Sequence, residues 1–259
     1  MIASHVPDKF ERYFEPFLGG GAVFFHLISE ERKAKWFLSD LNSDLVISYV
    51  IIRDRVKDLI SALEFHTENY FKNPSVYYYK VRENNPKNHI DKVSRLIFLN
   101  KTCFNGLYRV NSKGKFNVPL GRYVNPNIIN KENLLAVSKI LQSKEISIKC
   151  QDFEDALKNV GSGDFVYLDP PYQPVSTTAN FTSYTGDDFD FNDQKRLFTK
   201  FKSLDKKGAK VLLSNSKSKE ILTLFKEFSD GIIEINANRF INSISRKRTG
   251  HTELIIKNY

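Results

Sequence analysis

Three consecutive glycines near the start of the chain, Gly19–Gly21, separate segments of two different periodicities. The preceding segment "RYFEPF" (12–17) has the pattern of a strand, and "AVFFHLISEERK" (22–33) has the apolar spacing of a helix. A second apolar strand, "KWFLSD" (35–40), follows directly. A strand, a glycine turn, a helix and another strand form the opening unit of a doubly wound sheet. This unit therefore predicts an α/β fold.

The same alternation of strands and helices returns after about residue 146. Short apolar strands are expected at 146–151, 165–168 and 210–215, and helices at 190–208 and 219–228. The chain closes with two alternating segments, "GIIEINANRF" and "TELIIKN". We expect these two segments to form a hairpin at the sheet edge, with the last strands antiparallel.

The middle of the chain has a different character. A longer helix is expected from Ser43 to about Leu63, and residues 65–145 are then rich in Asn, Lys and aromatic residues. Helical pieces are expected at 75–85, 90–101 and 131–142. Between them, "CFNGLYRVNSKGKFNVPLGRY" (103–123) has the turn residues and alternation of a hairpin-like loop. We interpret residues 65–145 as an insert in an α/β domain formed by 1–64 and 146–259.

Charge and composition narrow the class of protein. The 259 residues include 39 Lys and Arg against 30 Asp and Glu, and the net charge of +9 favours a polyanionic partner such as nucleic acid. A lysine-rich proteome with a solvated surface would give the same balance. The two cysteines form no CxxC or Cys/His cluster, which argues against a disulfide framework and a structural zinc site.

No segment of the sequence resembles a membrane span or a secretion signal. The longest apolar run, "LVISYVII" (45–52), is far too short to cross a bilayer. The amino-terminal residues lack the apolar core of a signal peptide. We therefore expect a cytoplasmic protein that does not associate with membranes.

The glycine turn has the chemistry of a cofactor site. Glycines allow positive φ and a close approach of a ligand, and the following helix offers free N–H groups. Asp40 ends the next strand about twenty residues later, as expected of a carboxylate that binds ribose hydroxyls. These features suggest a nucleoside-containing cofactor, although a tight turn without a ligand explains the glycines equally well. The turn is neither a GxGxxG fingerprint nor a P-loop.

Asp152 and Phe153 follow the strand at 146–151. Asp152 could act only as a helix N-cap. At the carboxyl edge of the same sheet it could also accept a hydrogen bond from an adenine amino group, with Phe153 packed on the base.

The strand at 165–168 ends in "DPPY", Asp169 to Tyr172. Prolines have no N–H to donate, so we expect the carbonyls of Pro170 and Pro171 to be free to accept hydrogen bonds. Asp169 adds a second kind of acceptor and Tyr172 a flat stacking face. Acceptors that converge beside an aromatic ring suit a planar heterocycle with an exocyclic amine. A turn that only ends the strand is the alternative.

Acceptors at this corner would also activate such an amine. They pull the nitrogen from planar towards tetrahedral geometry, and its lone pair can then attack an electrophile. A methyl group on a sulfonium, transferred in line, is the obvious electrophile, with positioning and electrostatics supplying most of the rate.

Several motifs, in this order, resemble those of the Dam/DpnM-type (D12 class) DNA adenine-N6 methyltransferases: "EPFLGGGAVFF", "LSDLN", "NKTCFNGLYRVNSKGKFNVPLGRY" and "YLDPPY". The resemblance covers nearly the whole chain. It implies a Rossmann-like class I S-adenosylmethionine-dependent methyltransferase fold, with a mainly helical target-recognition insert carrying a β-hairpin loop. It also implies methylation of N6 of adenine in double-stranded DNA, by base flipping and most often at GATC.

The resemblance assigns roles to individual residues. Asp169, Pro170 and Tyr172 would hold the target base. The cofactor S-adenosylmethionine would be bound by Phe17, Gly19, Gly21, Asp40, Asp152 and Phe153. In the insert, Asn105, Leu107, Arg109 and Pro119 match base-reading or intercalating positions, and Arg109 is the candidate for a guanine contact. Candidate phosphate contacts are Lys101, Lys113, Lys115, Arg122, Arg246, Lys247 and Arg248. The loop 173–188 could close over the flipped base.

The resemblance departs at the start of the chain. Similar enzymes carry a Lys-containing segment before the first strand, and this chain begins where that segment would already have passed. We therefore expect either an amino-terminal truncation or another residue in place of that lysine. This departure motivates one alternative, a catalytically impaired DNA-binding member of the family.

Two further questions stay open at this point. A second alternative is a methyltransferase that acts on amines of RNA or protein, against which the hairpin of the insert argues. A cognate restriction endonuclease acting on the same site is compatible with the resemblance, as are a solitary and a viral enzyme.

Overall fold

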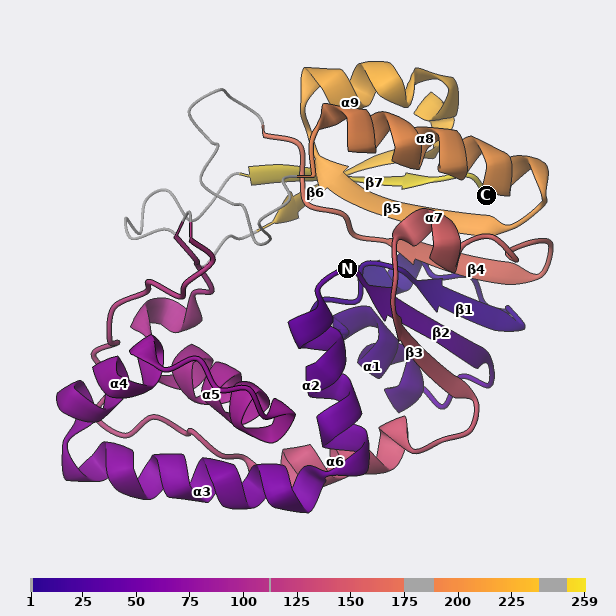
Figure 1. Ribbon diagram of the computed structural model, residues 1–259. Helices are drawn as coiled ribbons and strands as arrows, with labels where there is room; N and C mark the ends of the chain where they lie inside the picture. The colour runs from indigo at the N-terminus through magenta and orange to yellow at the C-terminus, as the bar shows by residue number, and fades with distance from the viewer. Residues whose placement is uncertain (1, 112, 175–188, 238–250) are drawn as a thin grey trace. The chain divides into compact units, whose positions relative to one another are not determined.

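The computed structural model describes residues 2–111, 113–174, 189–237 and 251–259 (Figure 1). Among them the chain divides into two compact units. The first holds the residues up to Leu41 and those from Glu145 onward, and the second is Asn42–Lys144. The sequence analysis placed the start of the insert at residue 65, whereas residues 42–64 group with it in the structure.

A seven-stranded sheet forms the centre of the first unit, in the order β3-β2-β1-β4-β5-β7-β6 (Figure 1). Every neighbouring pair from β3 to β5 is parallel, and β7 is antiparallel to both β5 and β6. The expected antiparallel hairpin at the sheet edge is therefore confirmed. The strands are β1 (Arg12–Glu15), β2 (Lys35–Asp40), β3 (Ile146–Cys150), β4 (Asp164–Leu168), β5 (Lys210–Ser216), β6 (Ile232–Ala237) and β7 (His251–Lys257).

Alternating side chains bury both faces of the central strands. On one face Tyr13 of β1 packs against Trp36 and Phe165, with ring centroids 5.3 and 5.6 Å apart. On the other face Phe14 and Leu168 belong to the core that also contains the apolar stripe of α8. Strands buried on both faces are typical of a parallel sheet. The helices of this unit are α1 (Ala22–Ser29), α7 (Phe153–Ala156), α8 (Phe191–Lys206) and α9 (Lys219–Leu224), with 3-10 helices η1 (Ile2–His5) and η4 (Lys226–Gly231).

This architecture confirms the expected mixed α/β, Rossmann-like class I methyltransferase fold. Parallel strands β1, β2, β3 and β4 all end at the same edge of the sheet. The residues that follow these strands are therefore brought together, as in other open α/β sheets that bind ligands at this edge.

The second unit is mainly helical. Its helices are α2 (Ser43–Asp54), α3 (Val56–Lys72), α4 (Pro74–Glu83), α5 (His89–Thr102) and α6 (Lys131–Leu141), with the 3-10 helix η2 (Phe104–Gly106). Ile51 of α2 and Leu59 of α3 share a buried cluster with Val93 of α5. This shared core explains why residues 42–64 belong to this unit.

The single helix expected from Ser43 to about Leu63 is wrong. The chain breaks at Arg55, which has φ −134° and ψ 33°, and α3 then continues to Lys72. Asp58 lies in the first turn of α3, where a carboxylate is favoured, and it accepts a hydrogen bond from the Arg55 guanidinium at 2.5 Å. The acidic residue was the signal for a new helix start.

The expected hairpin-like loop of residues 103–123 is present. Cys103 pairs with Leu120 and Val110 with Phe116 in isolated antiparallel bridges. Asn105 adopts a positive φ of 53°, a conformation that Asn tolerates better than most residues. None of the described helices is long and apolar enough to cross a membrane.

Candidate active site

The Asp-Pro-Pro-Tyr corner follows β4, whose five residues are all buried. Asp169 is exposed, Pro170 is buried, and Tyr172 is half-buried. Because β4 lies between β1 and β5, the corner stands at the middle of the carboxyl edge of the sheet. A rigid diproline at this point turns the chain out of the sheet directly after the carboxylate.

Protein surrounds the carboxyl group of Asp169 closely enough to change its acidity. The pKa of Asp169 is raised to about 6, mainly by desolvation and also by the negative charge of Glu253 on β7. Hydrogen bonds with the Tyr167 and Tyr172 hydroxyls act in the opposite direction. The single proton of the Tyr172 hydroxyl can be donated either to Asp169 or to Glu253 Oε2, which lies 3.3 Å away. Asp169 is therefore a carboxylate at neutral pH that gains a proton in mild acid.

One of the two proline carbonyls is not free. The Pro171 oxygen accepts a hydrogen bond from Gln194 Nε2 at 3.0 Å. The sequence analysis expected both carbonyls to be available, and this expectation is wrong for Pro171. Within the described part of the chain, no donor reaches the carbonyl oxygen of Pro170. The corner therefore presents the Pro170 carbonyl and the Asp169 carboxylate as its acceptors.

Glu15 is a titratable residue of this region that sequence reasoning missed. It is 2% exposed at the end of β1, and Tyr13 donates a hydrogen bond to its Oε2 at 2.9 Å. The pKa of Glu15 is raised to about 8, mainly by burial and also by the charge of Asp169. The signal was a carboxylate in "FEPF", at the end of an apolar strand expected beside the strand that carries Asp169.

The glycine turn joins β1 to α1 and is tied to β2. Gly19 has φ 47° and Gly21 has φ 66°, so both positions need the left-handed conformation that glycine adopts without strain. The Gly19 N–H donates to Asp40 Oδ2 at 2.9 Å. A Cβ at Gly19 or Gly20 would meet no atom within 4 Å. The turn therefore has open space beside it and a carboxylate held at its edge, which fits a ligand that carries hydroxyl groups.

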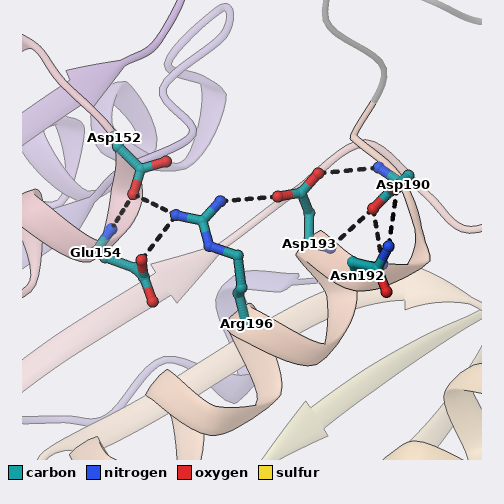
Figure 2. Close-up of polar contacts among 6 residues, drawn as sticks. All are labelled: Asp152, Glu154, Asp190, Asn192, Asp193 and Arg196. Carbon is teal, nitrogen blue, oxygen red and sulfur yellow. Dashed lines mark hydrogen bonds and ion pairs between the residues drawn. The ribbon is translucent and has the colours of Figure 1, made fainter.

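Asp152 follows β3 and begins α7. Its Oδ1 accepts a hydrogen bond from the Glu154 N–H at 2.9 Å, so the N-cap role is confirmed. Figure 2 shows the same carboxylate in an ion pair with Arg196 of α8, at 3.1 Å from Nη2 to Oδ1. Arg196 also contacts Glu154 at 2.7 Å and Asp193 at 2.8 Å. These contacts raise the pKa of Arg196 and fix the carboxylate of Asp152 at the sheet edge.

Phe153 points into the protein. Its side chain is 3% exposed and stacks on Phe17, with ring centroids 5.5 Å apart. The Arg196 guanidinium lies 4.9 Å from the centre of the ring. Little of the ring is left for a ligand, although its contact with a cofactor stays a prediction.

The candidate base-reading residues lie in the second unit. Arg109 is exposed, and its Nε donates to Asn117 Oδ1 at 2.7 Å across the hairpin-like loop. Asn105 and Pro119 are also exposed, and Leu107 is half-buried. Lys113 and Arg122 are exposed as well. The calls on Arg246, Lys247 and Arg248, and on the loop beyond Pro174, fall outside the described residues.

The carboxyl edge of the sheet thus combines four features that follow four adjacent strands. Gly19 follows β1, Asp40 ends β2, Asp152 follows β3 and Asp169 follows β4. This arrangement can hold a nucleoside on three strands and a planar amine on the fourth. The chemistry it supports is transfer of a group from the first ligand to the second.

Comparisons with known proteins point the same way. A family model described as D12 class N6 adenine-specific DNA methyltransferase matches residues 1–241. The Type II methyltransferase M.MjaIII of Methanocaldococcus jannaschii is 45% identical over 260 residues, which cover 96% of this chain and 89% of that protein. The Type II methyltransferase M1.LlaDCHI of Lactococcus lactis subsp. cremoris is 43% identical, with 98% and 88% covered. The DNA adenine methylase of Escherichia coli strain K12 is 30% identical, with 95% and 86% covered.

Proposed function

This chain belongs to the D12 class of N6 adenine-specific DNA methyltransferases, and we propose that it methylates a base-flipped adenine within GATC with S-adenosylmethionine as donor. The family makes it an adenine-specific DNA methyltransferase. The donor, the recognition sequence, base flipping and the residue roles are the parts of this proposal that go beyond the family.

Asp169 and Pro170 are proposed to receive the target amine. Adenine N6 carries two hydrogens, and the carboxylate and the carbonyl oxygen can accept one each. Both acceptors favour the tetrahedral geometry in which the nitrogen lone pair leaves the ring. Because the half-buried Tyr172 ring follows them directly, it is the candidate stacking face for the base. No strong base is required beforehand, since the nitrogen becomes acidic once it is alkylated, and Asp169 is placed to take that proton.

The glycine turn is proposed to hold the methyl donor. S-adenosylmethionine, when bound, supplies an electrophilic methyl group on its sulfonium. Asp40 would accept hydrogen bonds from ribose hydroxyls while Gly19 fixes its orientation. Asp152, held by Arg196, would accept a hydrogen bond from the adenine amine of the donor. The open space beside Gly19 and Gly20 supports this assignment.

The insert is proposed to read DNA. Its hairpin-like loop exposes Asn105, Arg109 and Pro119, and a guanidinium held by Asn117 has the planar fork that a guanine edge accepts. Flipping one base costs a few kcal/mol, which phosphate contacts from exposed lysines and arginines such as Lys113 and Arg122 would offset. A net charge of +9 supports such contacts.

One observation carries the proposal. Asp169 and the available Pro170 carbonyl stand at the sheet edge beside a glycine turn and Asp40. The test is transfer of a tritiated methyl group from S-adenosylmethionine to a GATC duplex and to a matched duplex in which GATC is scrambled. We expect transfer only to the first, and equal labelling of both would contradict the proposed specificity.

Two variants separate catalysis from folding. Asp169→Ala should abolish transfer and keep DNA binding, because the carboxylate is needed for the amine and not for the phosphates. Asp155→Ala removes an exposed aspartate of α7 and should leave transfer unchanged. A wild-type chain that binds GATC without methylating it would support the catalytically impaired alternative. Labelling of RNA or of protein, with no labelling of DNA, would support the alternative of a methyltransferase that acts on amines of RNA or protein.

A further inference from the structure

Two buried amides stand behind the Asp-Pro-Pro-Tyr corner. Gln194 lies near the start of α8 and Asn215 lies at the carboxyl end of β5, and both residues are 0% exposed. Fully buried amides are uncommon, and they are costly unless their hydrogen bonds are satisfied. The two side chains bond to each other, and each also bonds to the backbone around the corner, at Pro171 and Gln173, so their position calls for an explanation beyond packing.

The direction of every hydrogen bond in this group is fixed. Asn215 Oδ1 accepts from the backbone N–H groups of Gln173 at 3.2 Å and Ser216 at 2.8 Å. Its amino group must therefore face away from them, and it donates to Gln194 Oε1 at 3.0 Å. The amino group of Gln194 is then left to donate to the Pro171 carbonyl at 3.0 Å. Turning either amide over would oppose donor to donor.

This chain of bonds controls the backbone after Asp169. Gln173 is held at both of its backbone groups, because the Ser216 hydroxyl donates to its carbonyl at 2.5 Å. Pro171 is held at its carbonyl, which is its one backbone polar group. The carbonyl of Pro170, between Asp169 and these fixed points, has no donor from the described residues.

We propose that Gln194 and Asn215 are positioning residues for methyl transfer, which occupy the Pro171 carbonyl and fix the corner so that the target amine meets only Asp169 and the Pro170 carbonyl. This inference rests on the role of the corner in the proposed function. A second free carbonyl beside the first would offer the amine an unproductive partner. Hydrogen bonds in a buried network are strong, and they therefore suit the role of keeping the backbone of the Asp-Pro-Pro-Tyr corner in one position.

The first test separates positioning from stability. Gln194→Met keeps the length of the side chain and removes both bonds. Misplacement by about 1 Å can cost about 10²-fold in rate, so we expect a fall in kcat of that order with little change in the KM for DNA. The matched control is Asn258→Ala at the opposite end of β5. The Asn258 side chain makes three bonds where that of Gln194 makes two, accepting from the Val211 N–H at 2.7 Å and donating to the Ala209 carbonyl and to Asp205.

Both substitutions should lower the melting temperature, because both leave buried polar groups without partners. Only Gln194→Met should lower kcat in protein kept well below its melting temperature. A normal kcat in folded Gln194→Met, or an equal loss in Asn258→Ala, would overturn the proposal.

The second test measures how kcat depends on pH in a variant whose residue 194 can gain or lose a proton. In Gln194→Glu the ionised side chain can accept from Asn215 and cannot donate to Pro171, whereas the neutral acid can do both. The ratio of its kcat to that of the wild type should therefore rise as the pH falls, while the ratio for Gln194→Met stays flat. A carboxylate at position 194 would itself raise the pKa of Asp169 and so lower activity as the pH falls, and a ratio that rises as the pH falls therefore runs against that effect. A flat ratio for Gln194→Glu would contradict the donor role.

Failure of the proposed methyl transfer and failure of the positioning role of Gln194 give different experimental results. If the wild-type chain transfers no methyl group to adenine in GATC, the proposed function fails before the variants are compared. If the wild type is active and Asp169→Ala is inactive while Gln194→Met keeps full kcat, the proposed function stands and the positioning role fails.

Discussion

Replacing Glu15 with glutamine should stabilise the protein at neutral and alkaline pH. The Glu15 carboxyl group is buried at the end of β1, and its pKa is raised to about 8 from an ordinary value of 4.5. Burial is the main cause, followed by the charge of Asp169, while bonds from the Tyr13 hydroxyl and the Phe24 amide oppose the shift. Glutamine keeps an oxygen that can accept from Tyr13 and never becomes charged.

The size of the effect follows from the two pKa values. Between pH 4.5 and 8 the native state keeps a proton that the unfolded chain has lost, so the free energy of unfolding of the wild type decreases as pH rises. The contribution of Glu15 is fully present below pH 4.5 and is lost as the pH passes through about 8. One pKa unit corresponds to about 1.4 kcal/mol, and the whole window therefore amounts to about 5 kcal/mol.

Urea denaturation of the wild type and Glu15→Gln at intervals from pH 4.5 to 8.5 measures this difference. The stability of the variant relative to the wild type should increase by about 1 kcal/mol or more per pH unit in the middle of the window. Glu132→Gln, which removes an exposed glutamate of α6, is the control for the loss of one negative charge. Parallel pH profiles for wild type and Glu15→Gln would refute the assignment of a protonated, buried Glu15.

Three further outcomes are expected. The kcat/KM for methyl transfer should fall as the pH drops through about 6, when Asp169 gains its proton. In Glu253→Gln this acidic fall in kcat/KM should move to lower pH, because a like charge near Asp169 is removed. An acidic fall at the same pH in both proteins would contradict an electrostatic effect of Glu253 on Asp169. Arg196→Ala should raise the KM for S-adenosylmethionine, because Asp152 loses its partner at 3.1 Å, and should leave the KM for DNA unchanged; calorimetric titration with the cofactor product checks the first part. Arg109→Ala should reduce discrimination at one guanine of the site by about 1–3 kcal/mol, measured with single-base variants of the duplex, and an unchanged preference would remove the bidentate contact.

Features that depend on local pattern could be predicted from the sequence. The strand at 35–40 and the helices near 75–85 and 131–142 follow from periodicity, and the structure has them within about two residues. Gly19 and Asp40 could be placed at one sheet edge because parallel strands end together. The break at Arg55 was missed because apolar spacing continues across it, so that Asp58 was not recognised as the sign of a new helix start.

Features that depend on tertiary contact could not be predicted. Gln194 and Asn215 are 21 residues apart and belong to no motif, so nothing local distinguishes them from surface amides. The Pro171 carbonyl was expected to be free because its partner comes from α8. The stacking of Phe17 on Phe153 could not be predicted either, because the two residues lie far apart in the sequence.

The place at which the second unit leaves the sheet has an evolutionary consequence. The chain departs after β2 and returns just before β3, and these two strands are paired directly, with Asp40 opposite Cys150. Residues 42–144 thus form one crossover connection between neighbouring parallel strands, a link that elsewhere needs only a dozen or so residues. The pairing of β2 with β3 does not constrain the length of this crossover, so the crossover can change in length or sequence over evolution while the sheet and its carboxyl edge stay the same.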